Sequence, residues 1–152
     1  MSQAIFVEYL EKYGPEVVQM WRDSFRQAVG ANIPHPVEDQ LRFLEEELSR
    51  SNVVIVALEE GSGKVIGVLA FTPDKISQLY VHVDHQNIGI GSALLEIAKK
   101  KSAGCLRLFT FERNRQARRF YESRGFKLVA RGFEERMQLE DVEYEWCRKQ
   151  VV

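Results

Sequence analysis

Residues 76–101 restrict the fold of this chain most, because a strand-like run passes through two glycines into a helix. The apolar and β-branched run at 76–83 is typical of a strand. Apolar residues at 90–101 recur at helical spacing. Gly89 and Gly91 lie at the junction, where a helix N-terminus exposes unpaired N–H groups and partial positive charge. The segment therefore predicts a strand–helix unit with a phosphate site at its junction.

The remaining segments change period in the same way and predict the element order β-α-α-β-β-β-α-β-α-β-β. We expect strands at 4–9, 52–60, 65–72, 76–83, 105–111, 126–133 and 141–148, and helices after Pro15, after Pro36, at 90–101 and at 114–124. A helix joins the fourth and fifth strands, so these should be parallel neighbours with a right-handed crossover, while the hairpins are antiparallel. The expected fold class is α/β (α+β): a mixed, mostly antiparallel sheet of about seven strands, with helices on both faces.

Composition bounds the class of protein. The 152 residues, without repeat or linker, indicate a single domain spanning 1–152, and a hydrophobic content of 45% excludes a disordered chain. The net charge of −1 provides no electrostatic footprint for nucleic acid. We expect no membrane span and no signal peptide, hence a cytoplasmic protein. Cys105 and Cys147 stand in apolar, strand-like settings, so we expect buried, reduced thiols.

Three interpretations of the glycine junction remain open from the residues. The segment lacks the lysine of a Walker loop. A dinucleotide loop would need a third glycine, where Leu94 stands, although Glu112 could take the place of the ribose-binding acid. The glycines could also form only a tight turn. The pattern Q/R-x-x-G-x-G/A between a strand and a helix matches residues 86–91 better.

The order and spacing of four segments resemble the GNAT superfamily of acetyl-CoA-dependent N-acetyltransferases. These segments are this pattern, the preceding run IxxLYVHV, the following helix SALLEIAKK and the later run NRQARRFYESRGF. The resemblance covers residues 53–131 clearly and the first fifty residues weakly. It implies a GNAT-like fold, acetyl-CoA as cosubstrate and direct transfer of an acetyl group to an amine. A non-catalytic acyl-CoA-binding regulator and a dinucleotide-binding oxidoreductase remain the alternatives.

The resemblance also implies where coenzyme A binds. The pyrophosphate would lie on the N–H groups of Ile88, Gly89, Ile90, Gly91 and Ser92, with Gln86 at the start of the motif. The pantetheine arm would run along the fourth strand, using the backbone of Leu79, Val81 and Val83, and the N–H of Val81 would stabilise the oxyanion. Asn114 would cap its helix and also contact the arm.

Tyr121 is the implied general acid, which hydrogen-bonds the sulfur and protonates the leaving thiolate. A thiol has a pKa of about 8.5 and a phenol of about 10, so this transfer is not strongly uphill. A core aromatic beside Phe120 is the structural alternative. The arginines around this helix have two possible roles. One of them could bind the 3′-phosphate of coenzyme A, or together they form a solvated basic face; they are Arg113, Arg115, Arg118 and Arg119.

The base that accepts the amine proton is not evident. A lysine-like amine has a pKa of about 10.4, so a proton must leave before attack. The run at 76–83 contains no carboxylate that could act as the base. His82 is a possible base by residue type and lies on the same strand face as Gln78 and Tyr80. Ordered water that leads to bulk solvent is the favoured base. Three scattered histidines and two distant cysteines lack the spacing of metal ligands, so we expect no metal.

The acceptor is expected to be a small-molecule or peptide amine. Trp21, Phe25 and the loop at 32–35 could line its pocket, although Trp21 and Phe25 also fit a core stripe. The acidic stretch at 134–145 would favour a cationic amine if it faced that pocket. Whether the protein is a monomer or a homodimer stays open.

Overall fold

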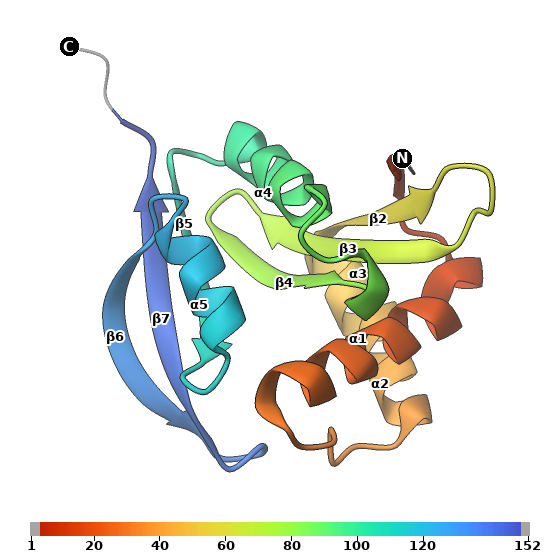
Figure 1. Cartoon of the computed structure of the whole chain (residues 1–152), viewed down its shortest axis with the longest axis horizontal. Helices are drawn as coiled ribbons and strands as arrows, with labels where there is room; N and C mark the ends of the chain where they lie inside the picture. The colour runs from red at the N-terminus through yellow and green to blue at the C-terminus, as the bar shows by residue number, and fades with distance from the viewer. Residues whose placement is uncertain (1–3, 150–152) are drawn as a thin grey trace.

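The computed structural model describes residues 4–149, which form one seven-stranded sheet in the order β1-β2-β3-β4-β5-β7-β6, with helices on both faces (Figure 1). The strands are β1 (Ala4–Glu8), β2 (Val53–Glu59), β3 (Val65–Thr72), β4 (Lys75–Val81), β5 (Cys105–Phe111), β6 (Lys127–Glu134) and β7 (Leu139–Cys147). The helices are α1 (Gly14–Val29), α2 (Val37–Phe43), α3 (Ser49–Ser51), α4 (Ile90–Lys101) and α5 (Arg115–Glu122), with short helical turns η1 (Glu11–Tyr13), η2 (Leu44–Leu48) and η3 (Val83–His85).

The expected element order and fold class are confirmed. β4 and β5 are parallel, and every other pair of neighbouring strands is antiparallel. The second predicted helix is a continuous run of α2, η2 and α3, in which η2 is a π-helical turn.

One boundary in the functional region was wrong, because β4 ends at Val81 and Val83 opens the turn η3. The N–H of His82 makes the last bond to β3, donating to the carbonyl oxygen of Ile66 at 2.9 Å. The His82 ring nitrogen Nδ1 then accepts from the N–H of Asp84 at 3.1 Å, which caps the turn. Val83 therefore contributes no strand edge.

The centre of the core is β3, which is buried on both faces. Leu69 packs with Leu94 in the cluster under α4, and Val68 packs with Val18 in the cluster under α1. A strand covered on both sides is expected to be apolar throughout, and β3 is. The helices α1 and α4 are therefore fixed on opposite faces of the same strand pair, β3 and β4.

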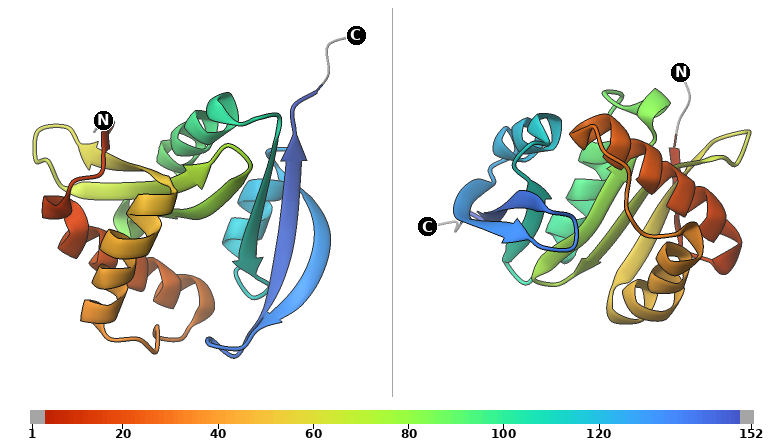
Figure 2. Two further views of the ribbon diagram at one scale, coloured as in Figure 1. Left: turned by 180° about the vertical axis from the view of Figure 1, so that it is seen from behind. Right: turned by 90° about the horizontal axis from the view of Figure 1, so that it is seen from below.

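The strands β4 and β5 share a single registered pair, Lys75 with Arg107. Beyond that pair β4 continues along β3, whereas β5 continues along β7. The sheet thus has two wings, β1-β2-β3-β4 and β5-β7-β6, and Figure 2 shows them diverging from two further sides. The open edges of β4 and β5 face each other where the wings separate.

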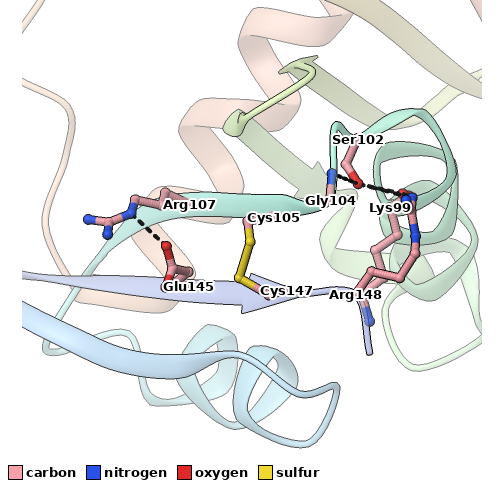
Figure 3. The surroundings of a disulfide bond; sticks show 8 residues. All are labelled: Lys99, Ser102, Gly104, Cys105, Arg107, Glu145, Cys147 and Arg148. Carbon is pink, nitrogen blue, oxygen red and sulfur yellow. Dashed lines mark hydrogen bonds and ion pairs between the residues drawn. A yellow bond between two sulfur atoms is a disulfide. The ribbon is translucent and has the colours of Figure 1, made fainter. Parts of the chain in front are cut away.

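The expectation of buried, reduced cysteines is wrong. Cys105 and Cys147 are exposed, lie opposite each other in β5 and β7 with Cα atoms 4.0 Å apart, and form a disulfide (Figure 3). The pairing of β5 with β7 brings the two cysteines together. They are 42 residues apart in the sequence, which gives no sign of this contact. The expected cytoplasmic location therefore draws no support from the cysteines. No helix within residues 4–149 is both long and apolar enough to cross a membrane.

Candidate active site

A cavity of about 820 Å³ occupies the place where the two wings separate. Its walls are β4 and β5, its one end is formed by α5 and the start of α4, and its other end is formed by α1. The predicted glycine junction, the predicted tyrosine and the first helix thus meet in one space.

The glycine junction forms the wall at the start of α4. Gly89 is the N-cap with φ of 94°, a left-handed conformation that favours glycine. The first helical bond runs from the N–H of Ala93 to the carbonyl oxygen of Gly89, so the N–H groups before Ala93 precede the helix ladder. Gly91 is needed for another reason, because a Cβ there would lie 3.2 Å from the Phe120 ring.

Four of the six residues expected at the pyrophosphate line the cavity: Gln86, Gly89, Gly91 and Ser92. The side chain of Ile88 is 58% exposed and that of Ile90 is buried in the core, so only their backbone can face an anion. Gln86 connects two walls: its Nε2 donates to the carbonyl oxygen of Val81 at 3.2 Å, and its Oε1 accepts from Gln116 at 3.1 Å.

Arg124, which the sequence analysis did not single out, lies beside this junction. Its guanidinium donates to Ser92 Oγ at 2.7 Å from Nη2 and lies 4.0 Å from the centre of the Phe120 ring. Arg124 follows α5 in the run YESRGF. Because it is separated from the glycines by β5 and α5 in the chain, its proximity to them could not be inferred from the sequence. It adds a positive charge to the end of the cavity where the helix N-terminus is already positive.

The backbone of β4 presents an open edge to the cavity. Since the N–H of His82 bonds back to β3, the N–H and C=O of Val81 point away from β3. The Val81 carbonyl oxygen indeed accepts from Ser24 Oγ at 2.9 Å, across the cavity wall. By the same alternation the backbone of Leu79 faces the open edge.

Tyr121 and Asn114 come to the cavity from α5. Tyr121 is buried, packs edge-on against Phe120 and Phe126, and lines the cavity. Burial, with a smaller contribution from Tyr80, raises the pKa of the Tyr121 phenol above its ordinary value. Asn114 caps α5 as expected, with Oδ1 accepting from the N–H of Ala117 at 3.1 Å.

Of the four arginines around α5, Arg119 lines the cavity. Arg113 donates to the carbonyl oxygen of Val29 at 3.1 Å, and Arg118 donates to the Tyr144 hydroxyl at 2.9 Å. Arg113 and Arg118 therefore fasten the start of α5 to α1 and β7. Arg115 lies in a separate hollow beside Glu112 and Glu140.

The α1 end of the cavity is aromatic. Phe25 and Phe111 lie edge to face with ring centres 5.6 Å apart, and Phe109 and Tyr80 complete the wall. Burial raises the pKa of Tyr80 to about 12, so this phenol is protonated at neutral pH. The strand alternation of β5 could have revealed Phe109 and Phe111, because both stand on the face opposite the core residues Leu106 and Leu108.

Trp21 and the loop at 32–35 do not line the cavity, although Phe25 does. Trp21 is buried and stacks on Tyr80 with ring centres 5.5 Å apart. Ile33 is buried in the cluster of Trp21 and Phe25. These residues therefore support the wall from behind.

His82 is outside the cavity lining. Its Nδ1 lies 3.4 Å from Nδ1 of His85, whose Nε2 lies 3.0 Å from a carboxylate oxygen of Glu59. Burial, followed by the positive charge of Lys64, lowers the pKa of His82. Among residues 4–149 there is no group of three or more His, Cys, Asp or Glu side chains placed to hold a metal ion.

Residues 50–128, just over half of the chain, match the family model described as an acetyltransferase (GNAT) domain. The chain belongs to the GNAT acetyltransferase family. This membership makes it an acetyltransferase, and it decides against the dinucleotide-binding oxidoreductase. The family match runs from β2 to α5 and includes the first two residues of β6, and every lining residue outside α1 falls within it.

Among similar proteins, one resembles this chain in sequence and two resemble it in fold. An uncharacterized N-acetyltransferase of Lactobacillus delbrueckii subsp. lactis is 28% identical over 149 residues, covering 82% of this chain and 85% of the relative. The solution structure of apo YjaB from Escherichia coli superposes with a TM-score of 0.76 at 20% identity, covering 97% of this chain and 99% of that one. The structure of YncA from Salmonella typhimurium with acetyl-CoA has a TM-score of 0.68 at 17% identity, covering 98% and 96%.

Proposed function

We propose that this single domain is an N-acetyltransferase that moves an acetyl group from acetyl-CoA to a primary amine by direct attack. The observation that carries the proposal is the continuity of one cavity, from the glycine-capped start of α4, past Tyr121, to the aromatic end under α1. Acetyl-CoA fits the cationic end, and the amine enters at the other. The acetyl-CoA held by YncA, a protein of similar fold, supports this assignment.

The pyrophosphate of coenzyme A binds to the N–H groups of residues 88–92, since a diphosphate carries more charge than one donor can satisfy. Arg124 and Arg119 add positive charge at this end. The pantetheine arm pairs with the open edge of β4 at Leu79 and Val81. Because Val83 lies beyond the strand, the arm does not use it.

Asn114 has a second role in this arrangement. Its Oδ1 is engaged in the helix cap, while its amide nitrogen remains to donate to a carbonyl of the pantetheine arm. The cap fixes the direction of that donor, so Asn114 positions the arm at the same time as it starts α5.

In the transfer step the amine nitrogen attacks the thioester carbonyl carbon, and a C–N bond forms. The negative charge that develops on the carbonyl oxygen is stabilised by the N–H of Val81. Collapse of the intermediate breaks the C–S bond, and Tyr121 donates its proton to the sulfur. The Tyr121 phenol is protonated at neutral pH and can donate. Burial raises its pKa and makes it a weaker acid, so the transfer depends on the hydrogen bond that it makes to the developing thiolate.

The proton lost by the amine passes to water. Within residues 4–149 the cavity lining contains no carboxylate and no histidine, and His82 belongs to a separate cluster with His85 and Glu59. Ordered water that leads to bulk solvent is therefore the base we assign.

The test is Tyr121→Phe, which should lower turnover of any accepted amine by about a hundredfold or more, within the range of general acid catalysis. Affinity for acetyl-CoA, measured by calorimetry, should stay within about twofold, because the ring and its packing are kept. Tyr13→Phe is the matched control: Tyr13 packs at the edge of the other core cluster, outside the cavity lining. Equal turnover of wild type and Tyr121→Phe would reject Tyr121 as the acid.

A further inference from the structure

We infer that the acceptor is a monoamine that carries an apolar or aromatic group close to its amino nitrogen. Polyamines, aminoglycosides and other polycations are excluded as preferred acceptors. The inference rests on the proposed function, because it assigns the α1 end of the cavity to the amine.

The charge of the cavity is distributed unevenly. In the part of the chain that the structure describes, the charged side chains that line it are Arg119 and Arg124, both at the end formed by α5. No Asp, Glu, Lys or His of residues 4–149 lines any part of it. A second or third ammonium group would lose its water at the α1 end without gaining an opposite charge.

The acidic stretch at 134–145 does not supply that charge. Glu143 and Glu145 lie opposite Phe109 and Arg107 in the β5–β7 pairing, and both engage Arg107, at 3.5 and 2.9 Å, so that its positive charge offsets them. The carbonyl oxygen of Glu140 accepts from the N–H of Glu112 at 3.0 Å, and the Glu112 carboxylate lies 3.2 Å from Arg131. None of these carboxylates is a lining residue, so the stretch does not favour a cationic acceptor.

The apolar surface at this end is built to cover a ligand. Phe25 is buried in the cluster with Trp21 and Ile33, and it meets the half-buried Phe111 edge to face. Phe109 lines the cavity yet is 67% exposed, the largest exposed fraction among the large hydrophobic side chains described. A large apolar side chain at the mouth of a cavity gains most from a partner that covers it. An aromatic or branched aliphatic group on the acceptor would do so.

The same apolar wall compensates for the missing base. Desolvation disfavours the charged form of an amine and lowers its pKa, so a larger fraction of the bound amine is neutral. An acceptor with an apolar group at the nitrogen places that nitrogen among Phe25, Phe111 and Ala28. The neutral nucleophile then needs only water to remove the proton that it releases after attack.

The experiment compares 2-phenylethylamine, the N-terminal amine of a Phe-Ala-Ala peptide, and spermidine as probes, with thiol release as the readout. We expect kcat/KM for 2-phenylethylamine or the peptide to exceed that for spermidine at least tenfold, and the preferred probe distinguishes a free amine from a peptide N-terminus. Phe111→Ala should raise KM for the preferred probe about tenfold while kcat changes less.

Ala28→Glu tests the charge argument in the opposite direction, because it places a carboxylate on α1 at the cavity wall. The ratio of kcat/KM for spermidine to that for 2-phenylethylamine should rise at least tenfold in this variant. Each variant is first checked for a higher melting temperature with acetyl-CoA, which shows that the fold and the cosubstrate site are intact.

The failures are distinguishable. A wild-type preference for spermidine, or acetyl-CoA binding without acetylation of any of the three probes, would overturn the acceptor inference and leave cosubstrate binding intact. An unchanged melting temperature with acetyl-CoA would instead overturn the proposed function, and the acceptor inference with it.

Discussion

Reduction of the Cys105–Cys147 disulfide should destabilise the protein substantially. The two cysteines are 42 residues apart, so the bond closes a long loop in the unfolded chain. Chain-entropy theory assigns such a loop about 13 cal/mol/K, or about 4 kcal/mol at 25 °C. With an unfolding entropy of about 2.1 cal/mol/K per residue, this corresponds to about 12 °C in Tm for a chain of this length.

The assay is thermal unfolding followed by calorimetry, with and without a strong phosphine reductant. The double variant Cys105→Ser/Cys147→Ser is the matched control; it should melt near the reduced wild type and ignore the reductant. Thiol titration of the unfolded protein should detect no free thiol before reduction and two after it. Free thiols in the untreated protein, or a Tm that reduction leaves unchanged, would refute the argument from β5–β7 pairing.

Two further predictions concern the glycine junction and the histidine cluster. Gly89→Glu should abolish acetyl-CoA binding in calorimetry, because it puts bulk and negative charge at the proposed phosphate end of the cavity. Gly63→Glu is the control: it introduces the same left-handed strain in the β2–β3 turn and should bind acetyl-CoA normally. Retained affinity in Gly89→Glu would refute a phosphate site at the start of α4. The lowered pKa of His82 means that the unfolded chain binds more protons there, so wild type should lose stability as pH falls through and below about 6.5. His82→Gln should lose less over the same range while its pH–rate profile for acetyl transfer matches wild type, and loss of the acidic limb of that profile would make His82 the base.

The sequence alone was enough for the parts of this protein that depend on neighbouring residues. The change from strand period to helix period gave the right succession of seven strands and their helices along the chain. Asn114 was identifiable as a cap and Gly89 as part of the junction between strand and helix, because capping and glycine flexibility depend on a few consecutive residues. The end of β4 was missed by two residues, since a side-chain bond from His82 decides it.

Tertiary structure decided the features that join segments far apart in the chain. The pairing of β5 with β7 converted two cysteines that looked like reduced core residues into a bridge. The packing of α1 against β5 created the aromatic end of the cavity, and the packing of α5 against α4 brought Arg124 to Ser92. Each of these contacts is made through space after chain reversals, so no local period or spacing encodes it. The glycine-lined end of the cavity was therefore readable from the sequence, whereas its aromatic end was set only by packing.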